Sequence, residues 1–323
     1  MADAISGATT GRIFVFPGQG SQTVGMGKDL AEAFPAAAAV FEQVDEALGE
    51  RLSRLMFEGP EDQLTLTANA QPALMAVSLA SLRAIESEAG RVLGELCDVV
   101  AGHSLGEYSA LAAADTLDIA TAAKLLRLRG ESMQKAVPVG AGAMAALIGV
   151  DLDVAASIAQ AAAEGQVCDI ANDNGGGQVV LSGDVAAIDR ALALAPEHGV
   201  RRALKLPVSA PFHCALMAPA ADVMSEALAA TVLRVPAVPL LANITAAVSR
   251  DPDVIRRQLV EQVTGRVRWR ESMEALPGLR VTSLVELGAG KVLSGLVRRI
   301  DKAISSSAVG TPEEVRGFIE TLV

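Results

Sequence analysis

Short apolar runs alternate along the chain with longer stretches in which apolar residues recur every three or four positions. The runs at 13–16 and 99–100 predict strands, and the stretch at 107–114 predicts a helix. Pro72 is followed by apolar residues at helical spacing, so a helix is expected to begin at this proline. Strands and helices that alternate in this way are typical of α/β proteins.

The middle of the chain has a different order of elements. The pattern there predicts strand, helix, strand, strand, helix and strand, which is the ferredoxin-like order. These elements are expected at 144–150, 152–163, 168–172, 178–181, 186–194 and 202–206. We therefore predict a hydrolase-like parallel-sheet core formed by residues 1–139 and 208–323. A small ferredoxin-like domain at 140–207 is inserted into it, and a cleft is expected between the two.

Composition and charge narrow the class of protein. Hydrophobic residues make up 51% of the chain and aromatic residues 3%, so the core consists mainly of Ala, Val and Leu. The formal charge of −11 argues against nucleic acid as a partner. Neither a secretory signal nor an apolar run of about 20 residues is found, so we expect a soluble, cytoplasmic monomer. Cys97, Cys168 and Cys214 have no paired spacing and predict neither a disulfide nor a zinc site.

Residues 102–106 read Gly-His-Ser-Leu-Gly between a predicted strand and a predicted helix. Gly-x-Ser-x-Gly in that context is the pattern of a nucleophile elbow, where a sharp turn exposes a serine hydroxyl beside a helix N-terminus. The flanking glycines avoid collisions with neighbouring backbone. Ser104 is the candidate nucleophile, and an ordinary glycine-rich turn is the alternative interpretation.

A serine hydroxyl needs a base, most often histidine. His103 adjoins Ser104, but neighbouring residues on a tight turn point apart, and His198 lies in a polar turn where we expect it in solvent. His213 follows the small domain directly and borders the predicted cleft, so it is the candidate base; a structural histidine at a helix start is the alternative. Such a base predicts a rate that rises with pH near neutrality. Cys214 is an alternative nucleophile, although nothing around it indicates a lowered thiol pKa.

Arg129 lies on the apolar side of a predicted helix, together with Leu125 and Met133. An unpaired cation at such a position is costly. Either Arg129 pairs with a buried acid, for which Glu107 is the candidate, or it faces the cleft and binds an anionic ligand. The fork of a guanidinium suits a carboxylate. The residues alone leave both interpretations open.

Five longer segments carry further information. They are Phe-Pro-Gly-Gln-Gly-Ser-Gln at 16–22, Ala-Gly-His-Ser-Leu-Gly-Glu-Tyr at 101–108, Arg-Gly-Glu-Ser-Met-Gln at 129–134, Pro-Val-Ser-Ala-Pro-Phe-His-Cys-Ala-Leu-Met at 207–217 and Glu-Leu-Gly-Ala-Gly-Lys-Val-Leu-Ser-Gly-Leu at 286–296. Together they resemble the malonyl-CoA:acyl-carrier-protein transacylase family of type II fatty acid synthesis. The segments occur in the family's order and span nearly the whole chain.

The resemblance implies transfer of malonyl from malonyl-CoA to the phosphopantetheine thiol of acyl carrier protein, through a malonyl-serine and without a metal or cofactor. It implies Ser104 as nucleophile, His213 as base and Arg129 as the group that binds the malonyl carboxylate. A serine esterase or thioesterase, a binding module without activity, and an acyltransferase of polyketide synthesis are the alternatives.

The resemblance also implies supporting roles. Main-chain N–H groups of Gln19 and Leu105 would form an oxyanion hole, and Gln262 would help to hold the histidine. Main-chain groups, rather than a triad acid, would orient that histidine. Ser109 and Asn172 would line the cleft. A bulky residue before the histidine, here at position 212, would disfavour a methyl-branched acyl group.

Overall fold

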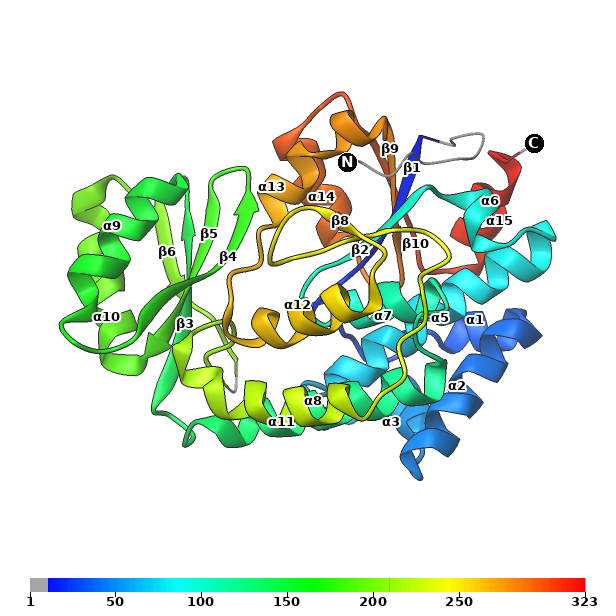
Figure 1. Ribbon diagram of the computed structural model, residues 1–323, viewed down its shortest axis with the longest axis horizontal. Coiled ribbons are helices and arrows are strands. Elements are labelled where there is room, and N and C mark those ends of the chain that lie inside the picture. Colours follow the sequence, from blue (N-terminus) through cyan, green and yellow to red (C-terminus); the bar gives the residue numbers. More distant parts are fainter. Residues whose placement is uncertain (1–10, 209, 323) are drawn as a thin grey trace.

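The computed structural model describes residues 11–208 and 210–322, so the amino-terminal segment searched for a secretory signal lies outside the described residues. Two sheets organise this part of the chain (Figure 1). The strands are β1 (Arg12–Phe16), β2 (Val99–Gly102), β3 (Gly142–Ile148), β4 (Cys168–Gly175), β5 (Gln178–Asp184), β6 (Arg202–Lys205), β7 (Leu240–Leu241), β8 (Val248–Ser249), β9 (Ser283–Leu287) and β10 (Ser305–Val309).

Helices pack against both sheets (Figure 1). They are α1 (Lys28–Ala33), α2 (Pro35–Leu48), α3 (Leu52–Glu58), α4 (Glu61–Leu64), α5 (Thr67–Ala89), α6 (Leu93–Leu96), α7 (Gly106–Ala113), α8 (Ile119–Ala136), α9 (Leu152–Ala163), α10 (Val185–Leu194), α11 (Ala218–Ala229), α12 (Pro252–Thr264), α13 (Trp269–Glu274), α14 (Val292–Ile300) and α15 (Pro312–Glu320), with 3-10 turns at Ala195–His198, Ala215–Met217 and Leu276–Leu279. No helix of the described residues has the length and apolar character needed to cross a membrane.

The larger sheet has the strand order β10-β9-β1-β2-β7-β8, and its neighbours are parallel except for β8. Side chains of β1 alternate between its faces: Phe14 and Phe16 join the core that contains α5 and α7, whereas Ile13 and Val15 join the core that contains α13 and α14. Burial on both faces explains the continuous apolar run. Because β1 and β2 are parallel neighbours, the loops that follow them begin at the same edge of the sheet.

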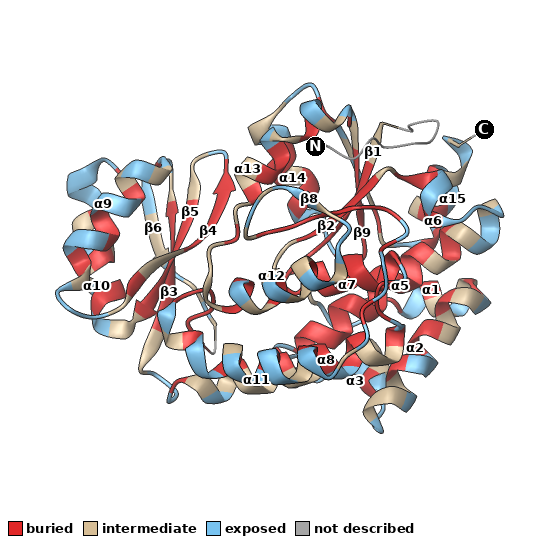
Figure 2. Ribbon diagram, in the orientation of Figure 1, coloured by how far each residue is buried: buried red, intermediate tan, exposed pale blue. Residues whose placement is uncertain are grey.

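The smaller sheet has the order β4-β5-β3-β6, with antiparallel neighbours throughout. Its elements follow the predicted sequence of strand, helix, strand, strand, helix and strand, and α9 has the predicted bounds. A separate apolar core joins this sheet to α9 and α10. Figure 2 shows the buried residues on the sides of these helices that face the sheet.

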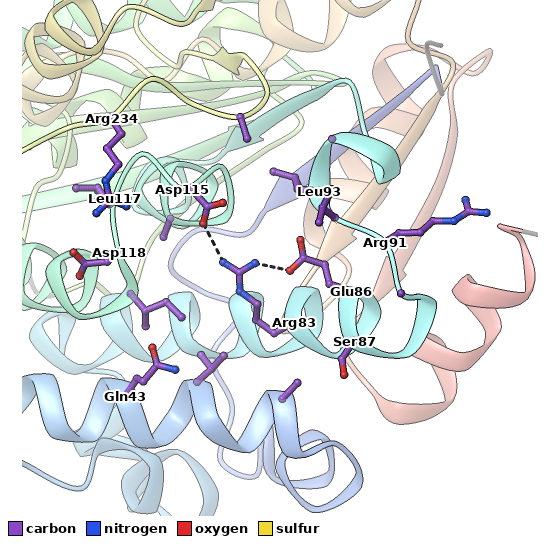
Figure 3. A pocket seen from close by; sticks show the side chains of 18 residues that line it. Gln43, Arg83, Glu86, Ser87, Arg91, Leu93, Asp115, Leu117, Asp118 and Arg234 are labelled. Carbon is purple, nitrogen blue, oxygen red and sulfur yellow. Dashed lines mark hydrogen bonds and ion pairs between the residues drawn. The ribbon is translucent and has the colours of Figure 1, made fainter. Parts of the chain in front are cut away.

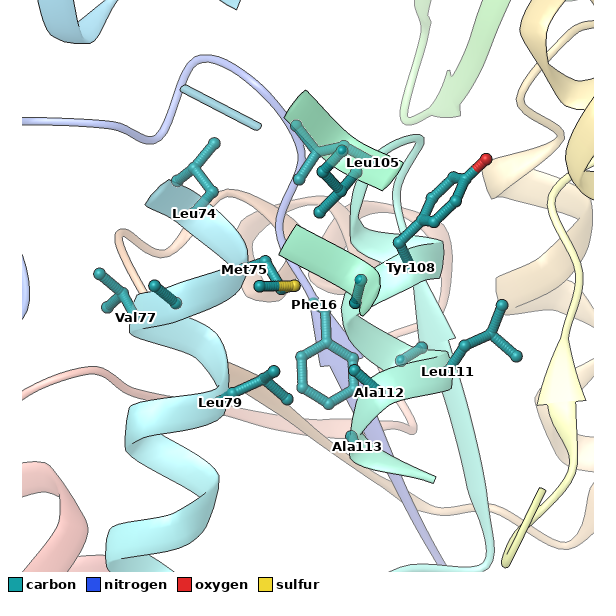
Figure 4. Packing of buried hydrophobic residues seen from close by; sticks show 14 of the residues in the cluster. Phe16, Leu74, Met75, Val77, Leu79, Leu105, Tyr108, Leu111, Ala112 and Ala113 are labelled. Atoms are coloured by element: carbon teal, nitrogen blue, oxygen red, sulfur yellow. The ribbon is translucent and has the colours of Figure 1, made fainter. Parts of the chain in front are cut away.

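The expected start of a helix at Pro72 is wrong. Helix α5 begins at Thr67, and Pro72 lies inside it. The first turn is stabilised from elsewhere in the chain, because the backbone N–H of Ala68 donates to the side chain of Gln134 at 2.9 Å. Most of α5 is buried, and Leu74, Met75 and Leu79 pack with Phe16 in the core beside α7 (Figure 4). Helix α5 is therefore a central helix with an amphipathic pattern weaker than that of a surface helix.

Candidate active site

Ser104 occupies the turn between β2 and α7 with a left-handed backbone, at φ +54°. The glycines on each side are required by space. A Cβ at Gly102 would lie 1.8 Å from the carbonyl carbon of Gly106, and one at Gly106 would lie 2.2 Å from the carbonyl oxygen of Phe16. The strand, the sharp turn and the helix have the geometry of an elbow that presents the serine hydroxyl.

His213 contacts this hydroxyl, with its Nε2 atom 2.7 Å from Ser104 Oγ. Its Nδ1 atom lies 2.8 Å from the carbonyl oxygen of Gln262 and 3.1 Å from that of Gly265. Because carbonyl oxygens only accept hydrogen bonds, Nδ1 carries the proton and Nε2 is free to accept from the serine. No carboxylate of the described residues contacts this ring.

The imidazole is only 3% exposed. Burial, together with the positive charge of Arg129, lowers the pKa of His213 to about 3. The ring is therefore neutral over the physiological range, in the tautomer that can take a proton from Ser104.

Arg129 on α8 is 1% exposed and surrounded by acceptors from three elements. Its Nη1 donates to Gln71 at 2.8 Å, and its Nη2 donates to Gln262 at 2.9 Å and to Ser104 Oγ at 3.2 Å. Its Nε is buried without a hydrogen-bond partner among the described residues. The guanidinium is thus fixed beside the serine, with its Nε–H donor unused.

The predicted alternative of an ion pair between Arg129 and Glu107 is not formed directly. Gln262 lies between them: its side-chain oxygen accepts from Arg129, and its amide nitrogen donates to the Glu107 carboxylate and to the carbonyl of Ser104. Burial raises the pKa of Glu107 to about 7, although hydrogen bonds from Asn243 and Gln262 oppose the shift.

Asn243 supports the elbow from the end of β7. Its side-chain oxygen accepts from the backbone N–H of Ser104 at 2.8 Å, and its amide donates to the carbonyl of Gly102 at 2.6 Å. Its own backbone N–H donates to Glu107 at 3.0 Å. The left-handed turn at Ser104 is therefore held on both sides by one side chain.

Two main-chain donors lie in the turns that follow β1 and β2. Gln19 lies in the loop after β1, and Leu105 is the N-cap residue of α7. Among the hydrogen bonds of the described residues, none uses the backbone N–H of Gln19 or Leu105 as its donor. Two free N–H groups, one at a helix N-terminus, are the components that stabilise a developing negative charge.

In the described part of the chain, the remaining candidate residues form no side-chain hydrogen bond with Ser104, His213 or Arg129. The Nε2 atom of His103 binds Asn174 at 2.9 Å and the ring packs against Trp269, which is a structural environment, while His198 is exposed. Asn172 lies on β4 and is 6% exposed. The structure gives neither its side chain nor the buried hydroxyl of Ser109 a hydrogen bond to Ser104, His213 or Arg129.

Cys214 is fully buried, and its Sγ donates to the carbonyl of Pro211 at 3.1 Å. Burial raises the pKa of its thiol to about 11, so the thiolate needed for nucleophilic attack does not form near neutrality. Of the two candidates, Ser104 has an imidazole nitrogen within hydrogen-bond distance, whereas Cys214 contacts a main-chain carbonyl.

Sequence reasoning missed Gln71, Asn243 and Asn174. Gln71 lies on a buried helix, where a lone polar residue without an identified partner was the available signal. Asn243 directly follows an apolar strand at the carboxyl edge of the sheet, a position that favours functional side chains. Nothing in the spacing of Gln71 or Asn243 along the sequence indicates which group each side chain contacts.

A hollow of about 910 Å³ lies elsewhere, between α2, α5 and the segment that precedes α8. Arg83 on its wall pairs with Glu86 and Asp115 (Figure 3). None of the candidate site residues lines this hollow. The described residues also contain no cluster of His, Cys, Asp or Glu that could hold a metal ion.

Comparisons with known proteins find relatives that match nearly the whole chain. The family model described as acyl transferase domain matches residues 13–294. The malonyl CoA-acyl carrier protein transacylase of Bacillus subtilis is 44% identical over 96% of this chain and 96% of its own. The crystal structure of the acyl-carrier-protein S-malonyltransferase of Bartonella henselae is 54% identical, with a TM-score of 0.94 over 97% of this chain and 99% of that one.

A further solved structure is a malonyl-transacylase in complex with a holo type II PKS acyl-carrier protein. It is 40% identical, with a TM-score of 0.92 over 96% of this chain and 99% of that chain. The chain therefore belongs to the acyl transferase domain family and, within it, to the malonyl CoA-acyl carrier protein transacylases.

Proposed function

We propose that this enzyme transfers the malonyl group from malonyl-CoA to the phosphopantetheine thiol of acyl carrier protein, through a malonyl ester on Ser104. The family supports the reaction class. The observation that carries the assignment is the chain of contacts from His213 to Ser104 Oγ and on to the Arg129 guanidinium. These contacts join a base, a nucleophile and a carboxylate-binding group in one place.

In the first half-reaction, His213 Nε2 takes the hydroxyl proton as Ser104 Oγ attacks the thioester carbonyl carbon. The N–H groups of Gln19 and Leu105 stabilise the tetrahedral oxyanion, each by roughly 3 kcal/mol. The carbon–sulfur bond then breaks, the proton on His213 passes to the sulfur, and free CoA thiol leaves. Malonyl-Ser104 and a neutral His213 remain.

The second half-reaction reverses these steps with a different thiol. The phosphopantetheine thiol gives its proton to His213, its sulfur attacks the ester carbonyl, and the proton returns to Ser104 Oγ as the carbon–oxygen bond breaks. The enzyme regains its starting state, so the mechanism is ping-pong and consumes no co-reactant.

Arg129 separates this proposal from a serine esterase. A buried cation next to the nucleophile favours an acyl group that carries a carboxylate at its far end, which malonyl does and a simple acyl chain does not. The Nε donor, which has no partner among the described residues, supports a contact with that carboxylate. Phe212, which is mostly buried directly before the base, supports exclusion of a methyl branch.

We also propose a division of labour within the fold. Residues 1–139 and 208–323 would form the hydrolase-like catalytic unit and residues 140–207 the ferredoxin-like one. The strand order β4-β5-β3-β6 and the separate apolar core support that division. The acceptor carrier protein serves fatty acid synthesis in this proposal, and a polyketide carrier protein is the alternative that the similar carrier-protein complex favours.

The test is acyl-enzyme trapping. Incubation with malonyl-CoA is expected to add one malonyl mass, on the peptide that contains Ser104, and addition of holo acyl carrier protein is expected to remove it. The Ser104→Ala variant, with a small change at a half-buried position, is expected to keep the melting temperature and lose the label. Label on Cys214, or loss of the label to water as fast as to the carrier protein, would refute the proposal.

A further inference from the structure

Four buried side chains form a continuous polar network behind Ser104. They are Glu107, Asn243, Gln262 and Arg129, each at most 1% exposed. Glu107 accepts from the backbone N–H of Asn243 with one carboxylate oxygen and from the amide of Gln262 with the other. The mechanism above gives Glu107 no role, although burial of its carboxylate is costly.

The chemistry of each member dictates how the network is oriented. Arg129 has only donors, so Gln262 must turn its side-chain oxygen toward it. An ionised carboxylate has only acceptors, so Gln262 must turn its nitrogen toward Glu107. The same nitrogen also donates to the carbonyl of Ser104 at 3.0 Å. Every requirement is met by a single orientation of the Gln262 amide.

We propose that Glu107 is a positioning residue for substrate selection, whose carboxylate orients the amide of Gln262 and thereby holds the Arg129 guanidinium in place for the acyl carboxylate. The inference rests on the proposed function, since it concerns the same acyl group. Gln71 holds Nη1 and Gln262 holds Nη2, so the guanidinium plane depends on both amides. Both amides accept from Arg129, but only Gln262 has a second charged contact, the Glu107 carboxylate, whereas the amide nitrogen of Gln71 donates to the uncharged Sδ of Met133.

A Glu107→Gln substitution tests this with almost no change in shape. In the variant, the side-chain oxygen of residue 107 accepts from the backbone N–H of Asn243, which can only donate. The new side-chain nitrogen therefore faces the amide nitrogen of Gln262. If Gln262 turns over to relieve that clash, its nitrogen then faces Arg129 and its oxygen faces the carbonyl of Ser104. Each arrangement leaves two donors opposed.

The measurement is kcat/KM for malonyl-CoA and for acetyl-CoA, which lacks the carboxylate. In Glu107→Gln the ratio of the two is expected to fall about ten- to hundredfold, with acetyl transfer changed by less than about threefold. Arg129→Ala removes the guanidinium altogether, so it gives the lowest malonyl-to-acetyl ratio that loss of the carboxylate contact can produce. If both substrates lose activity in parallel with a fall in melting temperature, or if neither changes, the proposal is wrong.

Glu286 offers a matched control. It is also a fully buried carboxylate, and it accepts from the backbone N–H groups of Leu293 and Ser294 at the start of α14. Glu286→Gln is expected to lower the melting temperature and leave the malonyl-to-acetyl ratio unchanged. An equal loss of selectivity in this variant would show that any buried carboxylate has the effect.

The wild-type enzyme provides a second readout if Glu107→Gln does not fold. Arg129 on α8 and Tyr108 on α7 are the titratable neighbours of Glu107, while α12 and the segment after β7 present uncharged groups. Since burial raises the pKa of Glu107 to about 7, its protonated form accumulates below that pH and no longer fixes Gln262. The malonyl-to-acetyl ratio is expected to fall as pH is lowered through about 7, and a constant ratio would overturn the proposal. Absence of malonyl-Ser104 in wild type would instead refute the proposed function.

Discussion

In the proposed mechanism, His213 is a base without a carboxylate behind it. Two carbonyl oxygens accept from its Nδ1, and burial disfavours the charged ring. A triad acid would raise the pKa of the imidazole, whereas carbonyl dipoles orient it at smaller electrostatic gain. A thioester suits this weaker base, because the leaving thiol is more acidic than an amine and departs without full protonation.

The pH dependence follows from this environment and differs from the sequence expectation. An ordinary histidine predicts a rate that rises near pH 6.5. With the pKa of His213 lowered to about 3, its neutral form persists through mild acid. Acetyl transfer, which does not use the carboxylate contact, is therefore expected to stay constant between about pH 5 and pH 8. A kcat/KM profile with an inflexion near 6.5 would contradict it.

The lowered pKa of His213 also makes the free energy of unfolding depend on pH. The folded pKa of His213 is lower than the unfolded value, so the unfolded chain binds the extra proton. The contribution of this group is fully present above about pH 6.5 and is lost as pH falls toward 3. In that pH window, the urea midpoint is expected to change less steeply with pH in His213→Gln than in the wild-type protein.

At the scale of elements, β1, β2 and α7 meet around the two glycines of the elbow. Gly106→Ala would place a methyl group 2.2 Å from the carbonyl oxygen of Phe16, so α7 and β1 must separate. We expect a loss of at least about 3 kcal/mol of unfolding free energy, measured by urea denaturation. Gly295→Ala in α14 is the control, because nothing lies within 4 Å of its Cβ and alanine favours a helix. Equal effects would show that space at Gly106 is not the cause.

How far the sequence predicts this structure depends on whether the deciding contact is local. Helix α9 was predicted to the residue, because its Asp151 cap and its periodicity lie within the helix itself. The start of α5 was missed, because its first turn is capped by Gln134 from another helix. Ser104, His213 and Arg129 follow from motif and pattern. Gln71 and Asn243 do not, since their partners lie 58 and 139 residues away.

At the scale of the whole molecule, β4 attaches the smaller sheet to the larger unit. Its residues Ala171 and Asp173 form backbone hydrogen bonds with Val267, and the carboxylate of Asp173 accepts from Arg270 at 2.9 Å. Asn174, on the same strand, contacts His103 beside the nucleophile. The two sheets are therefore joined close to Ser104, by contacts between β4 and residues outside the smaller sheet.

Arg270→Met tests this junction. Asp173 is 3% exposed, so loss of its cation leaves a nearly buried carboxylate without a charged partner. We expect about 1–3 kcal/mol of destabilisation by urea denaturation. The matched control is Arg54→Met, which removes a pair whose side chains are 69% and 62% exposed, and should cost less than about 1 kcal/mol. Similar effects for both variants would mean that burial of Asp173 contributes nothing.

The order of contacts along the chain bears on synthesis at the ribosome. Ser104 emerges early, His213 follows 109 residues later, and the two carbonyl oxygens that accept from its Nδ1 come another 49 and 52 residues on. A nascent chain shorter than 262 residues therefore lacks both carbonyl groups that orient the imidazole beside Ser104. We expect partly synthesised chains not to consume the acyl thioester, and reactivity to begin only when the polypeptide is long enough to close its core around the site.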